Sequence, residues 1–174
     1  MEMKKVKTPK DSEVIMSELV LPNDTNTLNN LMGGKLLHWM DIASGIAAQR
    51  HCNCSAVTAS VDNVSFAAPI RLGQVVGLTA RLTRAFKTSM EIFTEVKAED
   101  TKTGEIISSN SAFYTFVAVD ESGSTMDVPE LKPTNDHEKK LFDGALRRRQ
   151  LRLVMAGRMK PKEAAELKSI FVDE

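Results

Sequence analysis

Residues 33–50 read GGKLLHWMDIASGIAAQR and form the most apolar helical pattern in the chain. The residues Leu36, Met40, Ala43 and Ala47 follow the i, i+4, i+7 spacing of one helix face. Further apolar residues extend this surface most of the way round the helix, namely Leu37, Trp39, Ile42 and Ile46. We therefore expect a helix from Gly33 to about Arg50 that is buried rather than lying on a surface.

Strand-like segments lie on both sides of this helix. Residues 13–21 precede it and end at a Pro22–Asp24 turn, and four more segments follow it: 56–66, 74–86, 89–99 and 105–119. Because the turns that separate these four are short, we expect neighbouring strands to be antiparallel. One long helix and an antiparallel sheet predict an α+β fold in which the sheet curls around the helix. Its unprotected edges favour pairing between subunits.

Residues 74–86 show the alternation of a sheet with one solvated face. Apolar residues at Val76, Leu78, Ala80 and Leu82 alternate with a polar set consisting of Thr79, Arg81 and Thr83. The apolar set is expected to face the central helix and the polar set to face water.

The C-terminal part of the chain has a helical pattern of its own. A Pro-bounded linker runs to Pro133, and Asn135 with Glu138 three residues later is typical of a capping box that begins a helix to about Leu153. Pro161 suits the first position of a last helical segment at 162–171. We expect an N-terminal segment (1–12), one domain (13–133) and a C-terminal helical extension (134–174).

Composition limits the classes of function. The chain has 174 residues, 42% of them hydrophobic, and its 23 Lys and Arg balance its 23 Asp and Glu. Zero net charge argues against general nucleic-acid binding, and no apolar run reaches the about 20 residues that span a bilayer. Cys52 and Cys54 are too close in sequence to form a useful disulfide, which is consistent with a reducing compartment and a cytoplasmic location. The segment from His51 to Cys54 lacks a second ligand pair with zinc-site spacing, so no metal is expected.

Asp41 and the segment before the helix are candidate site residues. A carboxylate two turns into an apolar helix is either a base with reduced hydration or a structural Asp that faces a loop donor or a subunit boundary. Asn30 precedes Gly33 and Gly34, where backbone amides at a helix N-terminus can approach a carbonyl oxygen as an oxyanion hole. The alternative is an ordinary helix cap.

Hydroxyl and basic residues supply further candidates. Thr58 and Ser60 alternate with apolar neighbours, so their hydroxyls can face the helix, although Thr is also a common strand residue. Two basic groups suit phosphate oxygens: Arg84 with Lys87, Thr88 and Ser89 at a strand turn, and the helix segment Arg147–Arg152 with Arg148. A solvated helix face is the alternative for most of these arginines.

Taken together, these motifs resemble the hotdog-fold acyl-CoA thioesterases, in particular the bacterial acyl-CoA hydrolases related to YciA and to the brain acyl-CoA hydrolase. The resemblance covers about residues 13–150. It rests on these segments: LPND (21–24), NLMGGKLLHWMD (30–41), RHC (50–52), VTASVDNVSF (57–66) with Pro69 and Gly73, TSME (88–91) and FVAVD (116–120).

The resemblance implies a five-stranded hotdog sheet and a dimer, and in many relatives a trimer of dimers. It implies hydrolysis of fatty acyl-CoA at sites formed by Asn30 and Asp41 from facing subunits, with Thr58 as a third member. The amides at Gly33 and Gly34 would polarise the carbonyl, and coenzyme A would be part of the substrate and product, without a further cofactor. Many relatives have His where this chain has Met32, so no His-based step is expected there.

Other functions and another mechanism are compatible with the same residues. A non-catalytic acyl-CoA sensor on the same fold would bind the ligand without hydrolysing it. A hotdog dehydratase would need a His placed for proton transfer, and neither His38 nor His51 matches a site position. Asp41 could act as a general base or attack the carbonyl directly to give an anhydride.

Overall fold

The computed structural model describes residues 6–169, which fall into two compact units divided between Lys132 and Pro133. The first unit contains the sheet and the long helix, and the second contains α3 (Asp136–Met155), η2 (Pro161–Glu163) and α4 (Ala165–Lys168). None of the helices in the described part of the chain is long and apolar enough to cross a membrane. The predicted segments 1–12, 13–133 and 134–174 stay a prediction.

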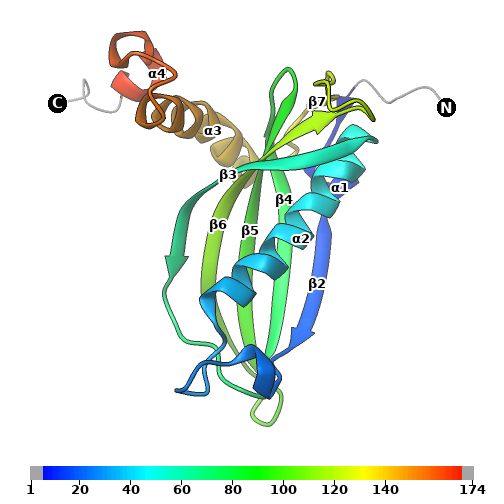
Figure 1. The fold of residues 1–174 in the computed structure, drawn as a ribbon, viewed down its shortest axis with the longest axis vertical. Coiled ribbons are helices and arrows are strands. Elements are labelled where there is room, and N and C mark those ends of the chain that lie inside the picture. Colours follow the sequence, from blue (N-terminus) through cyan, green and yellow to red (C-terminus); the bar gives the residue numbers. More distant parts are fainter. Residues whose placement is uncertain (1–5, 170–174) are drawn as a thin grey trace. The chain divides into compact units, whose positions relative to one another are not determined.

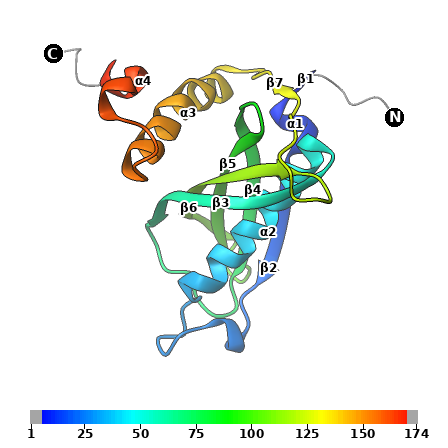
Figure 2. The ribbon, with the colours of Figure 1, turned by 45° about the horizontal axis from the view of Figure 1, so that its top comes forward.

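The first unit is a five-stranded antiparallel sheet with the order β2-β4-β5-β6-β3, and α2 (Gly33–Cys52) lies on one of its faces (Figures 1 and 2). The prediction of an antiparallel sheet curled around one long helix is therefore confirmed. The strands and the short helix before α2 have these bounds: β2 (Val14–Leu19), η1 (Pro22–Asp24), β3 (Ser55–Phe66), β4 (Val75–Ala85), β5 (Ser89–Asp100) and β6 (Glu105–Val119).

One expected pairing is wrong. β3 does not pair with β4, although the two strands follow one another in the chain. It pairs with β6 at one edge of the sheet, from Ser55 opposite Val119 to Phe66 opposite Asn110, whereas β4 pairs with β2 and β5. The segment between β3 and β4 therefore crosses the end of the sheet. Alternating polarity decides which face a strand buries but not which strand lies beside it.

The packing of α2 confirms one predicted face and corrects another. Leu36, Met40, Ala43 and Ala47 are at most 2% exposed, and the inward residues of β4 are equally buried. However, Ile42 is 39% exposed and Ile46 is 38% exposed. The helix is thus not buried all round in a single chain, because the sheet covers only one side of it.

Thr83 was expected on the solvated face of the sheet, and this expectation is wrong. A β-bulge between Leu82 and Arg84 shifts the register, and Thr83 is only 3% exposed. Its hydroxyl donates to the carboxylate of the fully buried Glu91 (2.5 Å). The bulge adds a residue to one strand, which interrupts the simple alternation.

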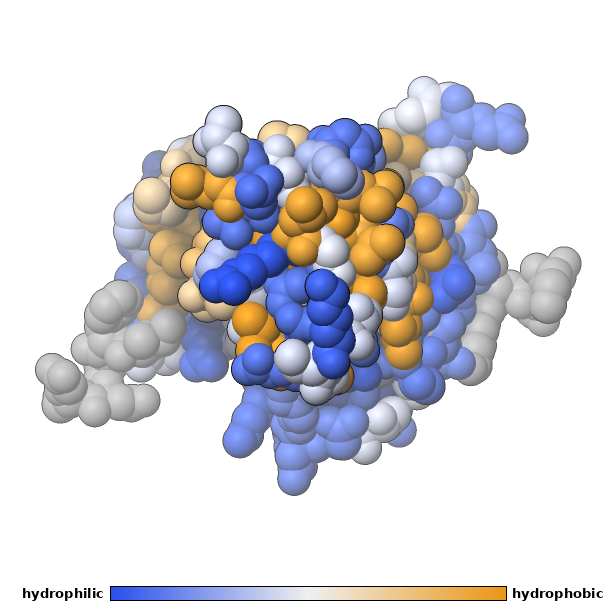
Figure 3. Space-filling view, turned by 90° about the horizontal axis from the view of Figure 1, so that it is seen from below, coloured by the Kyte–Doolittle hydropathy of each residue, from blue (hydrophilic) through white to orange (hydrophobic). Residues whose placement is uncertain are grey.

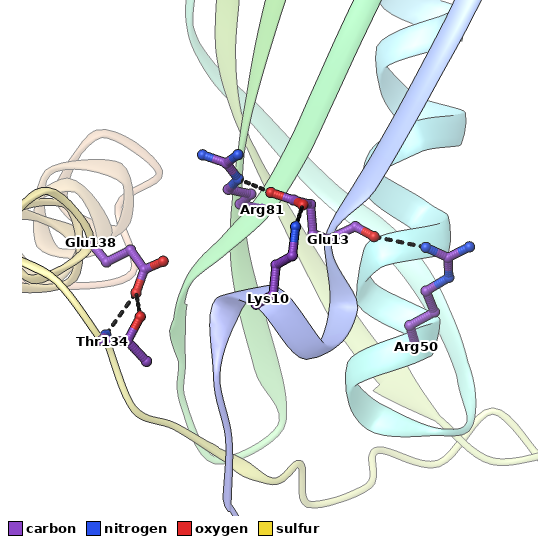
Figure 4. Close-up of polar contacts among 6 residues, drawn as sticks. All are labelled: Lys10, Glu13, Arg50, Arg81, Thr134 and Glu138. Atoms are coloured by element: carbon purple, nitrogen blue, oxygen red, sulfur yellow. Dashed lines mark hydrogen bonds and ion pairs between the residues drawn. The ribbon is translucent and has the colours of Figure 1, made fainter.

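The N-terminal residues fasten the C-terminal end of α2. β1 (Val6–Lys7) pairs in parallel with β7 (Glu130–Leu131), and Lys7 Nζ donates to the carbonyl oxygens of Arg50 and His51 (both 2.7 Å). After α1 (Pro9–Ser12), the Glu13 carboxylate contacts Lys10 and Arg81, and its backbone carbonyl accepts from Arg50 (Figure 4). A cation at the last carbonyl groups stabilises a helix end.

In the second unit, the predicted cap of α3 is present with one difference. Asn135 Oδ1 accepts from the Glu138 backbone N–H (2.9 Å), as expected. The Glu138 carboxylate, however, accepts from the backbone N–H (2.7 Å) and hydroxyl (2.8 Å) of Thr134 and not from Asn135 (Figure 4). In place of one helix at 162–171 there are the short η2 and α4, and residues 170 and 171 lie outside the described residues.

Candidate active site

The loop before α2 is held by backbone hydrogen bonds. Asn29 N–H donates to Asn26 O (3.0 Å) and Leu31 N–H donates to Ile70 O (2.7 Å), so backbone hydrogen bonds hold the loop on both sides of Asn30. The Asn30 backbone N–H donates to Asn26 Oδ1 (3.2 Å), and among residues 6–169 its own carboxamide has no hydrogen-bond partner. The loop therefore presents a free amide group at the N-terminus of α2.

Gly33 and Gly34 begin the helix in different surroundings. The first amides of a helix have no intrahelical partner, which leaves them available to a ligand. A Cβ atom on Gly33 would lie 3.3 Å from the Phe66 ring, whereas a Cβ on Gly34 would have no neighbour within 4 Å. A side chain at position 33 would therefore displace the Phe66 ring, which lies beside the backbone there.

Asp41 and Thr58 are brought together. The Thr58 hydroxyl donates to Asp41 Oδ1 (2.8 Å), which confirms that this side chain of β3 faces the helix. Asp41 is half-buried and Thr58 is exposed. One carboxylate oxygen is occupied by this bond, and Oδ2 remains available to accept a proton from water.

Ser60, the other hydroxyl considered, does not join this pair. Its hydroxyl donates to Asp62 Oδ2 (3.0 Å) on the same strand, beyond the irregularity in the register between Thr58 and Ser60. The irregularity explains why two residues that alternate in the sequence have different partners.

Tyr114 is a neighbour of Asp41 that the sequence analysis did not identify. Its side chain is 1% exposed, and its phenol donates to Leu37 O (3.1 Å) beneath the helix. Burial raises the pKa of Tyr114, and the negative charge of Asp41 raises it further, so the phenol stays protonated. Inward alternation along β6 could have placed this tyrosine, the only one in the chain, under α2.

A single chain does not bring Asn30 and Asp41 together. Asn30 lies before the helix begins, and Asp41 follows Gly33 by eight residues, which corresponds to about 12 Å along the axis at 1.5 Å per residue. Both amides of the predicted oxyanion hole therefore lie at the end of α2 near Asn30, and the carboxylate lies near the middle of the helix.

A cavity of about 300 Å³ adjoins Asn30. Its wall includes Gly33 and Leu36 of α2, Phe66 at the end of β3, and residues 67–70 of the connection to β4. The apolar wall and the adjacent amide groups suit a ligand with a hydrocarbon part and a carbonyl group.

The predicted phosphate-binding residues lie at the other end of the sheet. Arg84 and Lys87 lie at the β4–β5 hairpin. The opposite end of β4 lies near the loop of Asn30, and the eleven residues of this strand separate the two ends by about 36 Å. Lys87 is exposed, Thr88 is half-buried, and Ser89 is buried and accepts at its carbonyl from Phe86 N–H (2.8 Å). Arg148 belongs to the second unit, where its guanidinium donates to Leu141 O (2.7 Å).

The segment from His51 to Cys54 has a structural explanation. The His51 ring is fully buried at the end of α2 and contacts Pro129 O (2.8 Å), and burial lowers its pKa. Burial also raises the pKa of the Cys52 thiol to about 12, and both cysteines are free thiols. In the described part of the chain, no group of three His, Cys, Asp or Glu side chains could hold a metal ion.

The five-stranded antiparallel sheet and the long helix on one of its faces define a hotdog-fold protein. The family model of the thioesterase superfamily matches residues 28–105. The chain is 38% identical over 148 residues to the uncharacterized acyl-CoA thioester hydrolase YkhA of Bacillus subtilis, with 85% of this chain and 86% of that protein covered. The chain therefore belongs to the thioesterase superfamily.

Other relatives agree with this assignment. Mouse acyl-coenzyme A thioesterase 11 is 40% identical over 149 residues, although the match covers only 25% of that longer protein and 86% of this chain. A solved hexameric acyl-CoA thioesterase aligns with a TM-score of 0.85 at 36% identity, covering 88% of this chain and 98% of the other.

An acyl-CoA hydrolase from Staphylococcus aureus, solved with butyryl coenzyme A, aligns with a TM-score of 0.81 at 30% identity over 87% of this chain and 94% of the other. Alanine variants of one aspartate, one asparagine and one threonine of that enzyme have also been solved.

Proposed function

We propose that the chain hydrolyses the thioester of fatty acyl-CoA to a free fatty acid and coenzyme A, with Asp41 as the catalytic carboxylate. The observation that carries this proposal is the hydrogen bond from Thr58 to Asp41 on the central helix of a thioesterase-superfamily fold. Thr58 orients the carboxylate, and Asp41 Oδ2 takes a proton from the water that attacks the carbonyl carbon. Direct attack by Asp41 would use the same carboxylate and give an anhydride instead.

The carbonyl oxygen of the substrate binds at the N-terminus of α2. The free amides of Gly33 and Gly34 and the carboxamide of Asn30 are donors at this end of the helix, and the helix dipole adds a partial positive charge. Negative charge develops on this oxygen as the water attacks, so these donors stabilise the transition state more than the bound substrate.

Two copies of the chain are needed to bring Asn30 to Asp41. β3 is an edge strand with exposed Val57 and Val61 (51% and 40%), and the adjacent face of α2 exposes Ile42 and Ile46. Pairing two such surfaces about a two-fold axis runs the helices antiparallel and places Asn30 of one copy near Asp41 of the other. Assembly into a trimer of dimers is part of the proposal, supported by the hexameric neighbours.

The same two-fold arrangement accounts for the predicted nucleotide site. It brings the β4–β5 hairpin of one copy toward the Asn30 end of the other, so Arg84, Lys87, Thr88 and Ser89 can hold the phosphates of coenzyme A. Arg148 is a further candidate. Replacing Lys87 by Ala should weaken CoA esters more than thioesters of pantetheine without the nucleotide, and high salt should reduce this difference. Equal losses for both substrates would remove the hairpin from the phosphate site.

The catalytic proposal is tested by thiol release from acyl-CoA, measured with a thiol-reactive dye. Asp41→Asn should lower kcat by about 10²–10⁴-fold while coenzyme A still binds, because the amide cannot accept the proton. Thr58→Val should lower kcat, and Thr58→Ser should restore it, since only the hydroxyl is required. Binding of acyl-CoA without turnover by the unaltered protein would instead identify a sensor.

A cytoplasmic location and a reaction with no further cofactor are also part of the proposal.

A further inference from the structure

We propose that the second unit carries a docking surface for an anionic lipid membrane, formed by the C-terminal half of α3 and the residues that follow it. This surface, hereafter the basic surface, combines four cations and two apolar side chains, all of them exposed: Arg147, Leu151, Met155, Arg158, Lys160 and Lys162. The proposal goes beyond hydrolysis of acyl-CoA and does not depend on it.

Positive charge is concentrated in this part of the chain, although the net charge of the whole chain is zero. Residues 144–162 contain seven Lys and Arg and no Asp or Glu. The second unit as a whole, residues 133–174, has ten Lys and Arg against seven Asp and Glu. A local excess of cations attracts a surface of anionic phosphate groups even when the rest of the protein balances it.

The end of α3 turns the chain back toward the helix. Gly157 N–H donates to Val154 O (3.0 Å) and Arg158 N–H donates to Leu153 O (2.8 Å), with Gly157 in a left-handed conformation (φ 68°). These are the two hydrogen bonds of a Schellman motif, which ends a helix sharply. A hydrogen bond between α4 and α3 (2.9 Å) then fastens the returning chain. The cations that follow α3 are therefore held near its C-terminal end.

Three guanidinium groups at this end lie close enough to repel one another. Burial lowers the pKa of Arg149, and the positive charges of Arg152 and Arg158 lower it further. Arg149 and Arg152 are three residues apart on α3 and so are neighbours on the helix, whereas Arg158 comes from the turn. Anionic groups that approach this end reduce the repulsion, and lipid phosphates supply such groups.

Apolar side chains accompany the cations. Leu151 and Met155 are four residues apart, so they are neighbours on one face of α3, and they are 44% and 80% exposed. Exposed apolar side chains alone do not distinguish this surface: Figure 3 shows others on the face seen from below, and Leu28 in the first unit is 75% exposed. The distinction is that Leu151 and Met155 lie within an acid-free basic segment. A helix that carries both kinds of side chain suits the interface of an anionic bilayer.

A lipid surface fits these features better than two other partners. A second copy of the chain paired about a two-fold axis would bring the basic surface against itself, and like charges repel. A nucleic acid would attract the cations through its phosphates but would leave Leu151 and Met155 without an apolar partner. Acyl chains at a bilayer surface accept such side chains.

The test is sedimentation of the full-length protein with lipid vesicles. Vesicles of equal parts phosphatidylcholine and phosphatidylglycerol should bind the protein, phosphatidylcholine alone should not, and high salt should weaken binding. Since each cation near an anionic surface strengthens binding about fivefold, Arg158→Glu/Lys160→Glu should weaken it at least about 25-fold. Lys97→Glu/Lys102→Glu makes the same change of charge at exposed positions of the first unit and should retain binding.

A second pair of variants tests the apolar contribution. Met155→Ser should weaken binding to the mixed vesicles at least about fivefold, because the thioether side chain no longer enters the bilayer surface. Ile15→Ser, at a position in the first unit that is 71% exposed, is the matched control and should bind like the wild type.

The outcomes separate this proposal from its alternatives. Equal binding to both kinds of vesicle, or unchanged binding by Arg158→Glu/Lys160→Glu, would overturn it. Loss of binding in this charge variant with no effect of Met155→Ser would also overturn it, in favour of a general polyanion site such as one for nucleic acid. A changed oligomeric state of Met155→Ser, measured by light scattering, would identify a contact between copies instead.

Thiol release from butyryl-CoA without vesicles keeps the two proposals distinguishable. Arg158→Glu/Lys160→Glu and Met155→Ser should both retain wild-type activity in this assay, because no bilayer takes part in it. Loss of this activity together with vesicle binding would show that the substitutions disturb the fold and would remove the support for a docking surface. Absence of thiol release by the unaltered protein would overturn the thioesterase function and leave the docking surface intact.

Discussion

Activity should be restored when two inactive variants, Asn30→Ala and Asp41→Asn, exchange subunits. Within one chain the two positions are separated by about 12 Å of helix and the three residues before it, so they cannot readily contact one carbonyl group. After complete exchange of equal amounts, half of the dimers contain one chain of each kind. Each such dimer has one site with both native residues and one site with neither, so the expected activity is about a quarter of the wild-type value.

The assay is thiol release from one acyl-CoA ester after the mixed chains have been dissociated and reassembled. Mass spectrometry of chains with different tags establishes that exchange is complete. A second mixture, of wild type with the Asn30→Ala/Asp41→Asn double variant, is the matched control: a site shared between subunits predicts a fall from about half to about a quarter of full activity on exchange. Constant activity in the control and none in the first mixture would place each site within one chain and refute the geometric reasoning.

Three further perturbations test the surroundings of the site. Tyr114→Phe should destabilise the fold by about 1 kcal/mol, measured by urea unfolding, because the hydrogen bond to the helix is lost; an unchanged unfolding free energy would contradict this. Gly33→Ala should lower kcat/KM because the new methyl group displaces the Phe66 ring from the cavity, whereas Gly34→Ala should retain activity. Equal effects of the two substitutions would show that Phe66 has no role in substrate binding. Since burial lowers the pKa of His51, its contribution to stability is present above the unfolded value of about 6.5 and is lost as the pH falls below it. Unfolding free energies between about pH 5 and 7.5 should show this loss in the wild type but not in His51→Gln.

Local sequence patterns predicted the elements well. The helix expected at 33–50 runs from Gly33 to Cys52, and the strand expected at 56–66 runs from Ser55 to Phe66. Hydrophobic periodicity and turn-forming residues are local signals that extend over a few positions, so they can be recognised in the sequence. The neighbour of β3, the bulge at Thr83 and the exposure of Ile42 depend instead on which elements meet across the sheet, and the alternating pattern is compatible with more than one arrangement.

The same distinction applies to the site. Asp41 could be selected because a carboxylate is unusual in an apolar helix, and Thr58 because of its alternation; the structure adds the hydrogen bond between them. Tyr114 and Phe66 were missed because nothing in their local sequence separates them from ordinary strand residues. Their positions beneath the helix and beside its first residue arise only from tertiary packing.

The two ends of α2 differ in whether a side chain binds their unpaired backbone groups, and this difference supports binding of the substrate carbonyl at the N-terminal end. At the C-terminal end, the buried Lys7 ammonium satisfies the carbonyl groups of Arg50 and His51. At the N-terminal end, no side chain caps the helix, and Gly34 lies beside open space. A cation at the C-terminus stabilises the helix dipole without involving a ligand, whereas unpaired amides at the N-terminus favour an oxygen that carries partial negative charge. A thioester carbonyl provides such an oxygen, and its charge increases as the tetrahedral intermediate forms, so the uncapped end contributes most when the reaction requires it.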